Sequence, residues 1–541
     1  MGRKTDSFAQ SERGGITSSK SRSIAAYVIL GCTALFFLFY IFGPARYSYH
    51  SDTTDSMMWA HAALDAGGLV NADFYYAIFL LFNGHLLMVP FIAVFGFGIL
   101  AQQLGMAVFI LLFIWSFYTM LRVIGWERLS SASTVAILMF GLSVSEKSRE
   151  IFLDHVFTYS FSMFLLAVGM ILVVKSLRAS SDGKRFLLYA GLSGLWFFLG
   201  SLNRLESVTL FVVPLIGGLV GERFLAARPF ENERKKTEFF LLTAIIGVLS
   251  LLGIAVAGLV TKNLYAGYES AYSSFSASDQ WMGQAEKLLP YWMTYLGVDP
   301  LAYVPMGSVE GVILLLRIAV NLLLVAAPVV LLFLYRKITS RGERILILAH
   351  WVMSALILLA FVFGRIGNAN WRLSPIACTS IVLTCVLIRW IYQHSSMRRV
   401  AVVLLAPILL SCLLAMADVA SLHKEDYPVW TKRQELIAFL QENELDYGYA
   451  TFWNANIITM ESDSAVRVRN VKIESNLFEP YRYQTRASWY EDQPGQEEYF
   501  ILATTAEYNL LKTHEAELLK TANRTLTCGN YYIVVFSENV F

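Results

Sequence analysis

Long apolar segments recur along most of this 541-residue chain, and they limit what it can fold into more than any other feature. Hydrophobic residues make up 56% of the sequence and charged residues only 16%, whereas about 25% of a typical soluble domain is charged. An apolar run of roughly 18 residues or more is long enough to cross a bilayer as a helix. The sequence therefore predicts a polytopic α-helical membrane protein.

Basic residues between the apolar segments indicate the orientation, because Lys and Arg concentrate in cytoplasmic loops. If the N-terminus and every later basic cluster are cytoplasmic, the chain has about 11 transmembrane helices and its C-terminus lies outside. The expected helices cover residues 24–42, 103–122, 132–145, 157–175, 186–201, 205–221, 238–261, 309–335, 343–363, 374–391 and 400–417. The first is expected to be a signal anchor, preceded by a disordered cytoplasmic tail at 1–23.

The apolar run at residues 85–100 does not fit this scheme. It is short, contains Pro90, and is followed at once by the next predicted transmembrane helix. Counting it as a crossing would place Arg122 and Arg128 outside. We therefore expect a helix that lies in the outer interface or is re-entrant.

The sequence changes character after residue 417, where the transmembrane domain expected at 24–417 ends. Residues 418–541 mix charged and apolar positions. Helices are expected near 431–444 and 505–521, and strands near 446–452, 465–473, 499–504 and 530–537. The segment is long enough to fold independently, so we expect a small α/β extracytoplasmic domain.

Two aspartates, Asp52 and Asp55, lie in the first outer loop, where carboxylates are scarce. One interpretation is structural: Asp52 caps a short interfacial helix, Asp55 completes a capping box, and Gly67 and Gly68 end the helix. The other interpretation is chemical. A carboxylate held beside a water-poor membrane cavity is suited to take a proton from a hydroxyl.

Cationic residues in the outer loops are candidates for binding a phosphate group. They are Lys147 and His155 in the second loop, Arg204 between two apolar segments, and Arg365 and Arg372 around the fourth loop. Arginine at the outer end of a helix can bind phosphate through two hydrogen bonds, or it can extend to lipid headgroups. Arg365 is the first choice, because Gly364 and Gly367 beside it allow a ligand to approach the backbone.

The first outer loop resembles that of the GT-C glycosyltransferases, which include protein O-mannosyltransferases and lipid A aminoarabinose transferases. The resemblance covers residues 24–122 and rests on Asp55, Trp59-Ala60, Ala63, Gly67, His85, Pro90 and Phe95-Gly96. Ser56 departs from the pattern, because the family has Glu after the first Asp. The resemblance implies a GT-C-like architecture, a polyprenyl-phosphate-linked sugar donor, transfer on the outer face and Asp55 as catalytic base. Asp52 is then the candidate second acid.

The sequence thus predicts a glycosyltransferase that acts on an acceptor hydroxyl of a glycan, lipid or protein. No nucleotide-binding, metal-binding or Ser-His-Asp pattern is evident, so no cofactor or metal is implied, and the scattered basic residues argue against nucleic acid. The competing class is a transporter or flippase of a lipid-linked saccharide, and a third is a membrane sensor or assembly factor. Compact loops and a basic, Ser-rich start favour a bacterial plasma membrane.

Overall fold

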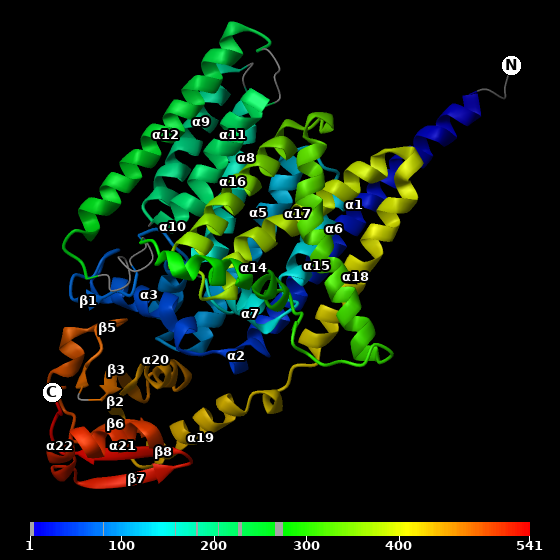
Figure 1. The fold of residues 1–541 in the computed structure, drawn as a ribbon. Coiled ribbons are helices and arrows are strands. Elements are labelled where there is room, and N and C mark those ends of the chain that lie inside the picture. Colours follow the sequence, from blue (N-terminus) through cyan, green and yellow to red (C-terminus); the bar gives the residue numbers. More distant parts are fainter. Residues whose placement is uncertain are drawn as a thin grey trace.

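The computed structural model describes residues 5–78, 81–156, 158–179, 182–203, 205–225, 230–265, 274–475 and 477–541, of which residues 5–19, 205 and 395 are described by their backbone alone. Figure 1 shows a bundle of long helices with a smaller domain of strands and helices at one end. The smaller domain is formed by the C-terminal part of the chain and lies beside α3 and β1 from the first outer loop.

Within the described ranges, nine helices are long and apolar enough to cross a membrane. They are Lys20–Phe42 of α1 (Thr5–Phe42), α5 (Ile99–Val123), α8 (Thr158–Arg178), Val208–Leu225 formed by η4 (Val208–Val212) and α11 (Val213–Leu225), α12 (Glu233–Thr261), α15 (Val309–Phe333), α16 (Arg341–Phe363), Asn370–Gln393 formed by η7 (Asn370–Leu373) and α17 (Ser374–Gln393), and α18 (Arg398–Ala420). The prediction of a polytopic helical membrane protein is confirmed.

Two further predicted transmembrane segments are also helices, but they differ from these nine. The helix α6 (Arg128–Gly141) would make a tenth only together with Glu146–Asp154, and the two parts are bent by 120°. The helix α9 (Gly183–Ser201) begins with Lys184 and Arg185, which lower its apolar character. It nevertheless packs along α8 and α12 in the bundle (Figure 1).

The apolar run at residues 85–100 contains a short helix. The helix α4 (His85–Phe95) is 11 residues long, which is too short to cross a bilayer. It packs between α3 (Asp55–Asp65) and α5.

At the N-terminus, residues 1–4 lie outside the described residues. Helix α1 already begins at Thr5, which differs from the disorder that composition predicts for the tail at 1–23.

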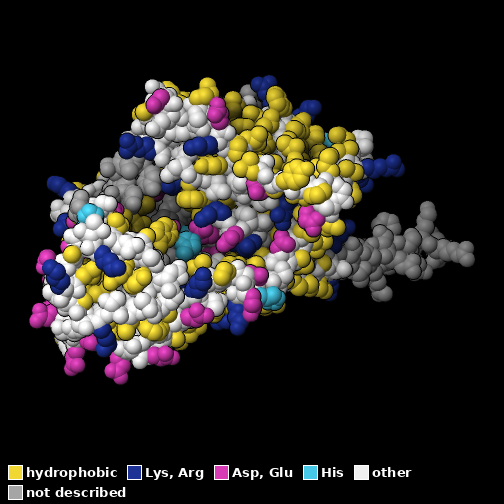
Figure 2. All heavy atoms as spheres, turned by 60° about the horizontal axis from the view of Figure 1, so that its bottom comes forward, with side chains coloured by type: hydrophobic (Ala, Val, Ile, Leu, Met, Phe, Trp, Pro, Cys, Tyr) yellow, Lys and Arg dark blue, Asp and Glu magenta, His cyan; other side chains and the backbone are white. Residues whose placement is uncertain are grey.

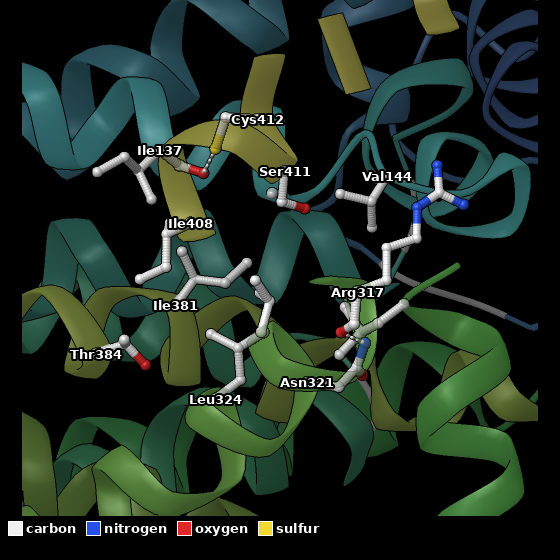
Figure 3. Close-up of a pocket in the computed structure, with 13 residues that line it drawn as sticks. Ile137, Val144, Arg317, Asn321, Leu324, Ile381, Thr384, Ile408, Ser411 and Cys412 are labelled. Carbon is white, nitrogen blue, oxygen red and sulfur yellow. Dashed lines mark hydrogen bonds between the residues drawn. The ribbon is translucent and has the colours of Figure 1, made fainter. Parts of the chain in front are cut away.

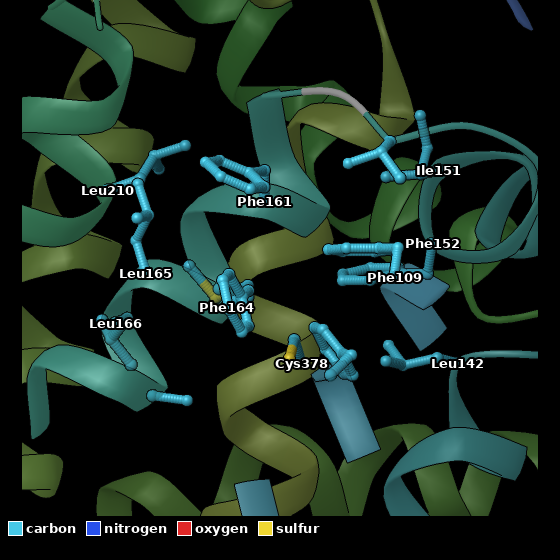
Figure 4. Packing of buried hydrophobic residues seen from close by; sticks show 14 of the residues in the cluster. Phe109, Leu142, Ile151, Phe152, Phe161, Phe164, Leu165, Leu166, Leu210 and Cys378 are labelled. Carbon is cyan, nitrogen blue, oxygen red and sulfur yellow. The ribbon is translucent and has the colours of Figure 1, made fainter. Parts of the chain in front are cut away.

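Aromatic packing fixes the second outer loop against the bundle (Figure 4). The rings of Phe109 and Phe113 on α5 have centroids 5.9 Å apart. Phe113 also lies 6.1 Å from Phe152, which belongs to η2 (Glu150–Asp154). Phe161 and Phe164 continue this cluster on α8. Because these rings are buried, η2 is held rigidly at the end of α5 and α8.

The C-terminal domain contains a six-stranded mixed sheet in the order β4-β3-β2-β6-β8-β7. The strands are β2 (Tyr447–Thr451), β3 (Arg467–Glu474), β4 (Leu477–Pro480), β6 (Tyr499–Thr504), β7 (Arg524–Cys528) and β8 (Tyr531–Phe536). The central strand β2 runs parallel to both neighbours, with Ala450 opposite Asn470 on β3 and Leu502 on β6. The remaining pairs are antiparallel.

Helices α19 (Pro428–Glu442), α20 (Phe452–Glu461), α21 (Thr505–His514) and α22 (Ala516–Lys520) accompany this sheet. The expected α/β domain is therefore present, with each predicted strand in its place. The helix expected near 505–521 is two helices, because Glu515 between them has a non-helical backbone, with φ −120° and ψ 37°. Helix α20 and strands β4 and β7 were not predicted.

The C-terminal domain is joined to the first outer loop by several polar contacts. Strand β1 (Phe74–Tyr75) of the loop pairs with β5 (Thr485–Arg486) of the domain. The buried Arg433 contacts both oxygens of Glu461, at 3.0 and 2.6 Å, and donates to the carbonyl of Tyr49 at 2.7 Å. Segments nearly 400 residues apart in sequence therefore form one continuous structure around the two aspartates.

Candidate active site

Asp55 is the first residue of α3, and its side chain is only 5% exposed. The N-cap of α3 is Thr54, which makes no side-chain capping bond, and the backbone N–H of Asp55 donates to the carbonyl of Asp52. The capping interpretation of the two aspartates is therefore wrong. The expected helix end is confirmed: Gly67 has φ +61°, and its N–H donates to the carbonyl of Leu64 at 3.0 Å.

The carboxyl of Asp55 lies in surroundings that disfavour its charge. Burial raises its pKa well above the usual value, and the charge of Asp52 raises it further, while the side-chain amide of Gln484 acts in the opposite direction. Among the described residues, Oδ1 of Asp55 has no hydrogen-bond partner. A buried carboxyl with a raised pKa and an unpartnered oxygen accepts a proton more readily than an ordinary aspartate does.

Asp52 belongs to the short helix η1 (Ser51–Thr54) and is half-buried. Burial raises its pKa, an effect that His50 and Lys147 oppose and Glu150 reinforces. Glu150 itself behaves differently. Although it is partly buried, its hydrogen bond with His50 and the nearby positive charges lower its pKa to about 2. Glu150 is therefore ionised, while the two aspartates resist ionisation, a separation typical of acid–base sites.

Two of the predicted cations lie close to this acidic group. Lys147 forms an ion pair with Glu150, and its ammonium lies 4.8 Å from the ring centroid of Trp371. The next residue, Arg372, donates to the hydroxyl of Tyr159. Both cations are half-buried. The structure thus brings the loop that holds Lys147 against the loop that holds Trp371 and Arg372.

His155, which was predicted to be a cation, and its neighbour Asp154 are both buried. Burial lowers the pKa of His155 to about 4, so its imidazole is neutral at pH 7 and cannot act as the predicted cation. Asp154 accepts hydrogen bonds from Tyr40 at 2.6 Å and from Ser48 at 3.1 Å. Through these bonds Asp154 joins the end of α1 to η2.

Arg365 and Arg204, the other predicted cations, are not joined to this group. Arg365 is exposed in the turn after α16, and no contact described for it reaches the acidic residues. The glycines beside it are required by the backbone of this turn. A Cβ on Gly364 would lie 2.5 Å from the carbonyl oxygen of Ala360, and one on Gly367 would lie 2.5 Å from that of Phe361. Arg204 lies outside the described residues.

Sequence reasoning missed Gln484, which comes from the C-terminal domain. Trp59 Nε1 donates to its Oε1 at 2.5 Å across 425 residues of sequence. His50 was missed as well, although it stands two residues before Asp52 and its Nε2 lies 3.5 Å from Glu150. Its position next to the predicted residues was a signal that could have found it, whereas nothing local marks Gln484.

Figure 2 views the molecule with the C-terminal domain brought forward, and charged side chains of both signs lie between that domain and the apolar bundle. An apolar cavity is found elsewhere, between α6, α15, α17 and α18 (Figure 3). It measures only about 30 Å³, enough for one water molecule. Arg317 at its edge pairs with Asp418 at 2.8 Å. No predicted site residue lines this cavity.

Two solved structures share the architecture described above. The apo oligosaccharyltransferase of Archaeoglobus fulgidus aligns with a TM-score of 0.50 at 11% identity, over 82% of this chain and 64% of its own. ArnT from Cupriavidus metallidurans, bound to undecaprenyl phosphate, aligns with a TM-score of 0.50 at 11% identity, over 94% of this chain and 97% of its own. Both are GT-C glycosyltransferases. The chain has the GT-C fold.

The GT-C architecture inferred from the first outer loop is thereby confirmed. This chain spans less than two thirds of the archaeal GT-C enzyme but nearly the whole of ArnT. No protein-family model and no curated protein sequence matches it. In the described parts of this GT-C chain, no group of three or more His, Cys, Asp or Glu side chains is arranged to hold a metal ion.

Proposed function

We propose that this GT-C protein is a membrane glycosyltransferase that moves a sugar from a polyprenyl-phosphate donor to an acceptor hydroxyl, with Asp55 as general base. The observation that carries the proposal is the buried Asp55 carboxyl, whose Oδ1 has no hydrogen-bond partner among the described residues, at the same end of the bundle as Lys147 and Arg372. A donor of this class is supported by ArnT, which has the same fold and is bound to undecaprenyl phosphate.

The chemistry needs one proton acceptor and one electrophilic carbon. Asp55 takes the proton of the acceptor hydroxyl on one of its two carboxylate oxygens, and the hydroxyl oxygen attacks the anomeric carbon of the donor. The bond between that carbon and the phosphate oxygen breaks, and the polyprenyl phosphate leaves with the electron pair. Displacement from the opposite face inverts the configuration at the anomeric carbon. Positioning of the two substrates supplies much of the rate.

The leaving phosphate gains negative charge in this step, and a fixed cation stabilises it. Lys147 and Arg372 are the first candidates, because both are half-buried beside Trp371 and Tyr159. Glu150 holds Lys147 in place through their ion pair. Arg365 is a weaker candidate, being exposed, and Arg204 is a candidate on sequence grounds alone.

Asp52 acts on Asp55 rather than on the substrate in this scheme. Its charge is the second cause, after burial, of the raised pKa of Asp55. A base with a pKa close to the working pH is the most effective. The related family has an acidic residue where this chain has Ser56. Asp52, four residues before Ser56, supplies the negative charge that is missing there.

For orientation, we propose a cytoplasmic N-terminus and an external C-terminal domain in a bacterial plasma membrane. Support comes from the buried Arg344 and the half-buried Arg389, which lie at the end of the bundle away from Asp55. An impermeant thiol reagent added to intact cells should modify the partly exposed Cys528. It should leave a Lys235→Cys variant unmodified at that position. The reverse pattern would overturn the orientation.

The function itself is tested in proteoliposomes that contain the purified protein and a polyprenyl-phosphate sugar with a radiolabelled sugar. An envelope extract supplies the acceptors. We expect the label to appear on an acceptor while free polyprenyl phosphate accumulates. Movement of the intact labelled lipid between leaflets, without any transfer of sugar, would instead support a flippase. Neither transfer nor movement would contradict both.

A further inference from the structure

We infer that Gln484 of the C-terminal domain is a positioning residue for Asp55, and that its side-chain amide orients the carboxyl of the proposed base. The inference rests on the proposed function. It gives the C-terminal domain a part in the active site, because one of its residues controls the proton acceptor at the end of the helical bundle.

The backbone at Gln484 is held in an uncommon conformation. Its φ of +54° lies in the left-handed region, which residues other than glycine seldom adopt. The surroundings determine this conformation: the N–H of Gln484 donates to the carbonyl of Tyr75 at 2.8 Å, and the next residue begins the strand β5, which pairs with β1. A strained, fully buried residue of this kind is a mark of functional sites.

The side chain of Gln484 bridges two residues of α3. Asp55 and Trp59 are four residues apart and thus lie on one face of the helix. The indole N–H of Trp59 can only donate, so it assigns the nearby amide atom, 2.5 Å away, as Oε1. The amide nitrogen Nε2 is then the atom left for Asp55. Within the described ranges, neither Nε2 of Gln484 nor Oδ1 of Asp55 has a hydrogen-bond partner.

The amide influences the charge of Asp55 in a definite direction. A donor beside a carboxylate favours the ionised form, and Gln484 accordingly lowers the pKa of Asp55 against burial and against Asp52, which raise it. The other titratable or charged groups around α3 are Asp52 on η1 and His85 on α4, whose pKa burial lowers to about 4. At the far end of α3, His61 and Arg486 contact Asp65, and beyond Asp52 lie His50, Glu150 and Lys147. None of these donates to Oδ1 of Asp55.

The position of Gln484 is secured by the contacts that join the two parts of the molecule. Ser51, next to Asp52, donates to the carbonyl of Phe452 at 2.6 Å. Arg486, two residues after Gln484, pairs with Asp65 at the end of α3 at 2.6 Å. The amide is therefore fixed relative to both ends of α3, so it orients the base before any substrate binds.

The substitution Gln484→Glu tests this role. It keeps the shape and the oxygen that accepts from Trp59, and it removes the N–H donor. We expect kcat/KM for sugar transfer at neutral pH to fall about ten-fold or more, the usual effect of removing a donor that stabilises a charged group. We also expect the acid limb of the kcat/KM profile to move to higher pH. The control is Gln441→Glu, which adds the same charge at an exposed position on α19 and should leave the profile unchanged.

The outcomes separate the inference from the proposed function. An unchanged pH profile for folded Gln484→Glu, beside an inactive Asp55→Asn, would overturn the inference and leave the base in place. Full activity of both variants would contradict the proposed function. If Gln484→Glu does not fold, Gln484→Met, which has a similar length and no charge, gives the same test, and an unshifted acid limb in that variant would overturn the inference.

Discussion

Two buried carboxylates at the end of the bundle away from the C-terminal domain, those of Glu222 and Glu343, are held by several donors. Glu222 accepts from Arg344 at 2.6 Å and from Arg341 at 2.9 Å, and Glu343 accepts from Trp126 and Arg389, both at 2.7 Å. At the other end, Asp55 keeps an oxygen without a partner among the described residues, and Nδ1 of His50 and Nε2 of Gln484 are likewise unpaired there.

The difference separates charge that holds a fold from charge that is available for chemistry. Buried polar groups are nearly always hydrogen-bonded, and those that are not need an explanation. At the paired end, Glu222 and Glu343 each accept from two side chains of the protein. At the unpaired end the free atoms lie beside cations and a carboxyl with a raised pKa. Local rules are expected to be broken mainly at functional sites.

The largest effect on stability is expected at the paired end. Arg344 is 3% exposed and its partner Glu222 is equally buried, so Arg344→Ala leaves a buried carboxylate without its closest partner. We expect a loss of about 3–5 kcal/mol in the free energy of unfolding, while transfer per folded molecule is retained. Thermal unfolding in detergent measures the first quantity and a transfer assay the second.

The matched control for this variant is Lys520→Ala, which breaks the exposed pair with Glu517. Exposed pairs contribute roughly 0–1 kcal/mol, so the unfolding temperature should hardly change. If Arg344→Ala abolished transfer by protein that is still folded, the separation of roles between the two ends would fail.

A smaller effect is expected for the cations at the unpaired end. Lys147→Ala and Arg372→Ala each remove a charge from the proposed phosphate site, and a charge-assisted contact of this kind is worth about 1.5–3 kcal/mol. We expect the KM for the donor to rise about ten-fold or more. Initial rates against donor concentration measure it. Arg372→Lys should restore only part of the loss, because the two-pronged guanidinium is absent.

Asp52→Asn should change the pH dependence rather than abolish transfer. The charge of Asp52 raises the pKa of Asp55, so removing that charge lowers the pKa of the base. Asp55 is active when ionised, and its ionised fraction then becomes significant at lower pH. We expect the acid limb of kcat/KM to move to lower pH. An inactive Asp52→Asn would make Asp52 the base and move the proposed chemistry by three residues.

The smallest effect is expected for Arg365→Ala. Its side chain is exposed, and Gly364 and Gly367 beside it are required for the packing of their own turn. The change should therefore leave the donor KM within about two-fold of the original value, as surface substitutions usually alter an interaction by less than 0.5 kcal/mol. A collapse of donor use in this variant alone would move the phosphate site to the turn after α16.

The transmembrane helices and the C-terminal α/β domain followed from sequence because apolar runs and alternating patterns are local properties. Asp55 was located by its resemblance to one loop of a known family. The sequence did not reveal that Thr54, not Asp52, occupies the N-cap position of α3, since helix boundaries shift by a few residues. It also did not show whether Gly367 serves a ligand or the backbone, because both functions require the same residue.

The contribution of the C-terminal domain to the candidate site could not be predicted from the sequence. The contact between Trp59 and Gln484 joins positions 425 residues apart, and no pattern around residue 484 distinguishes it from a surface glutamine. The pairing of β1 with β5 has the same character, because strands of two residues leave no periodicity to detect. Such contacts depend on how the two parts of the molecule pack.

The most direct test of Asp55 as general base is the single-turnover rate of Asp55→Asn, measured at saturating labelled donor with donor binding determined in the same sample. The substitution keeps the shape of the side chain and removes the proton acceptor. The proposed mechanism predicts a folded variant that binds donor normally and transfers sugar about 10²–10⁴-fold more slowly. A rate close to that of the original protein would contradict it.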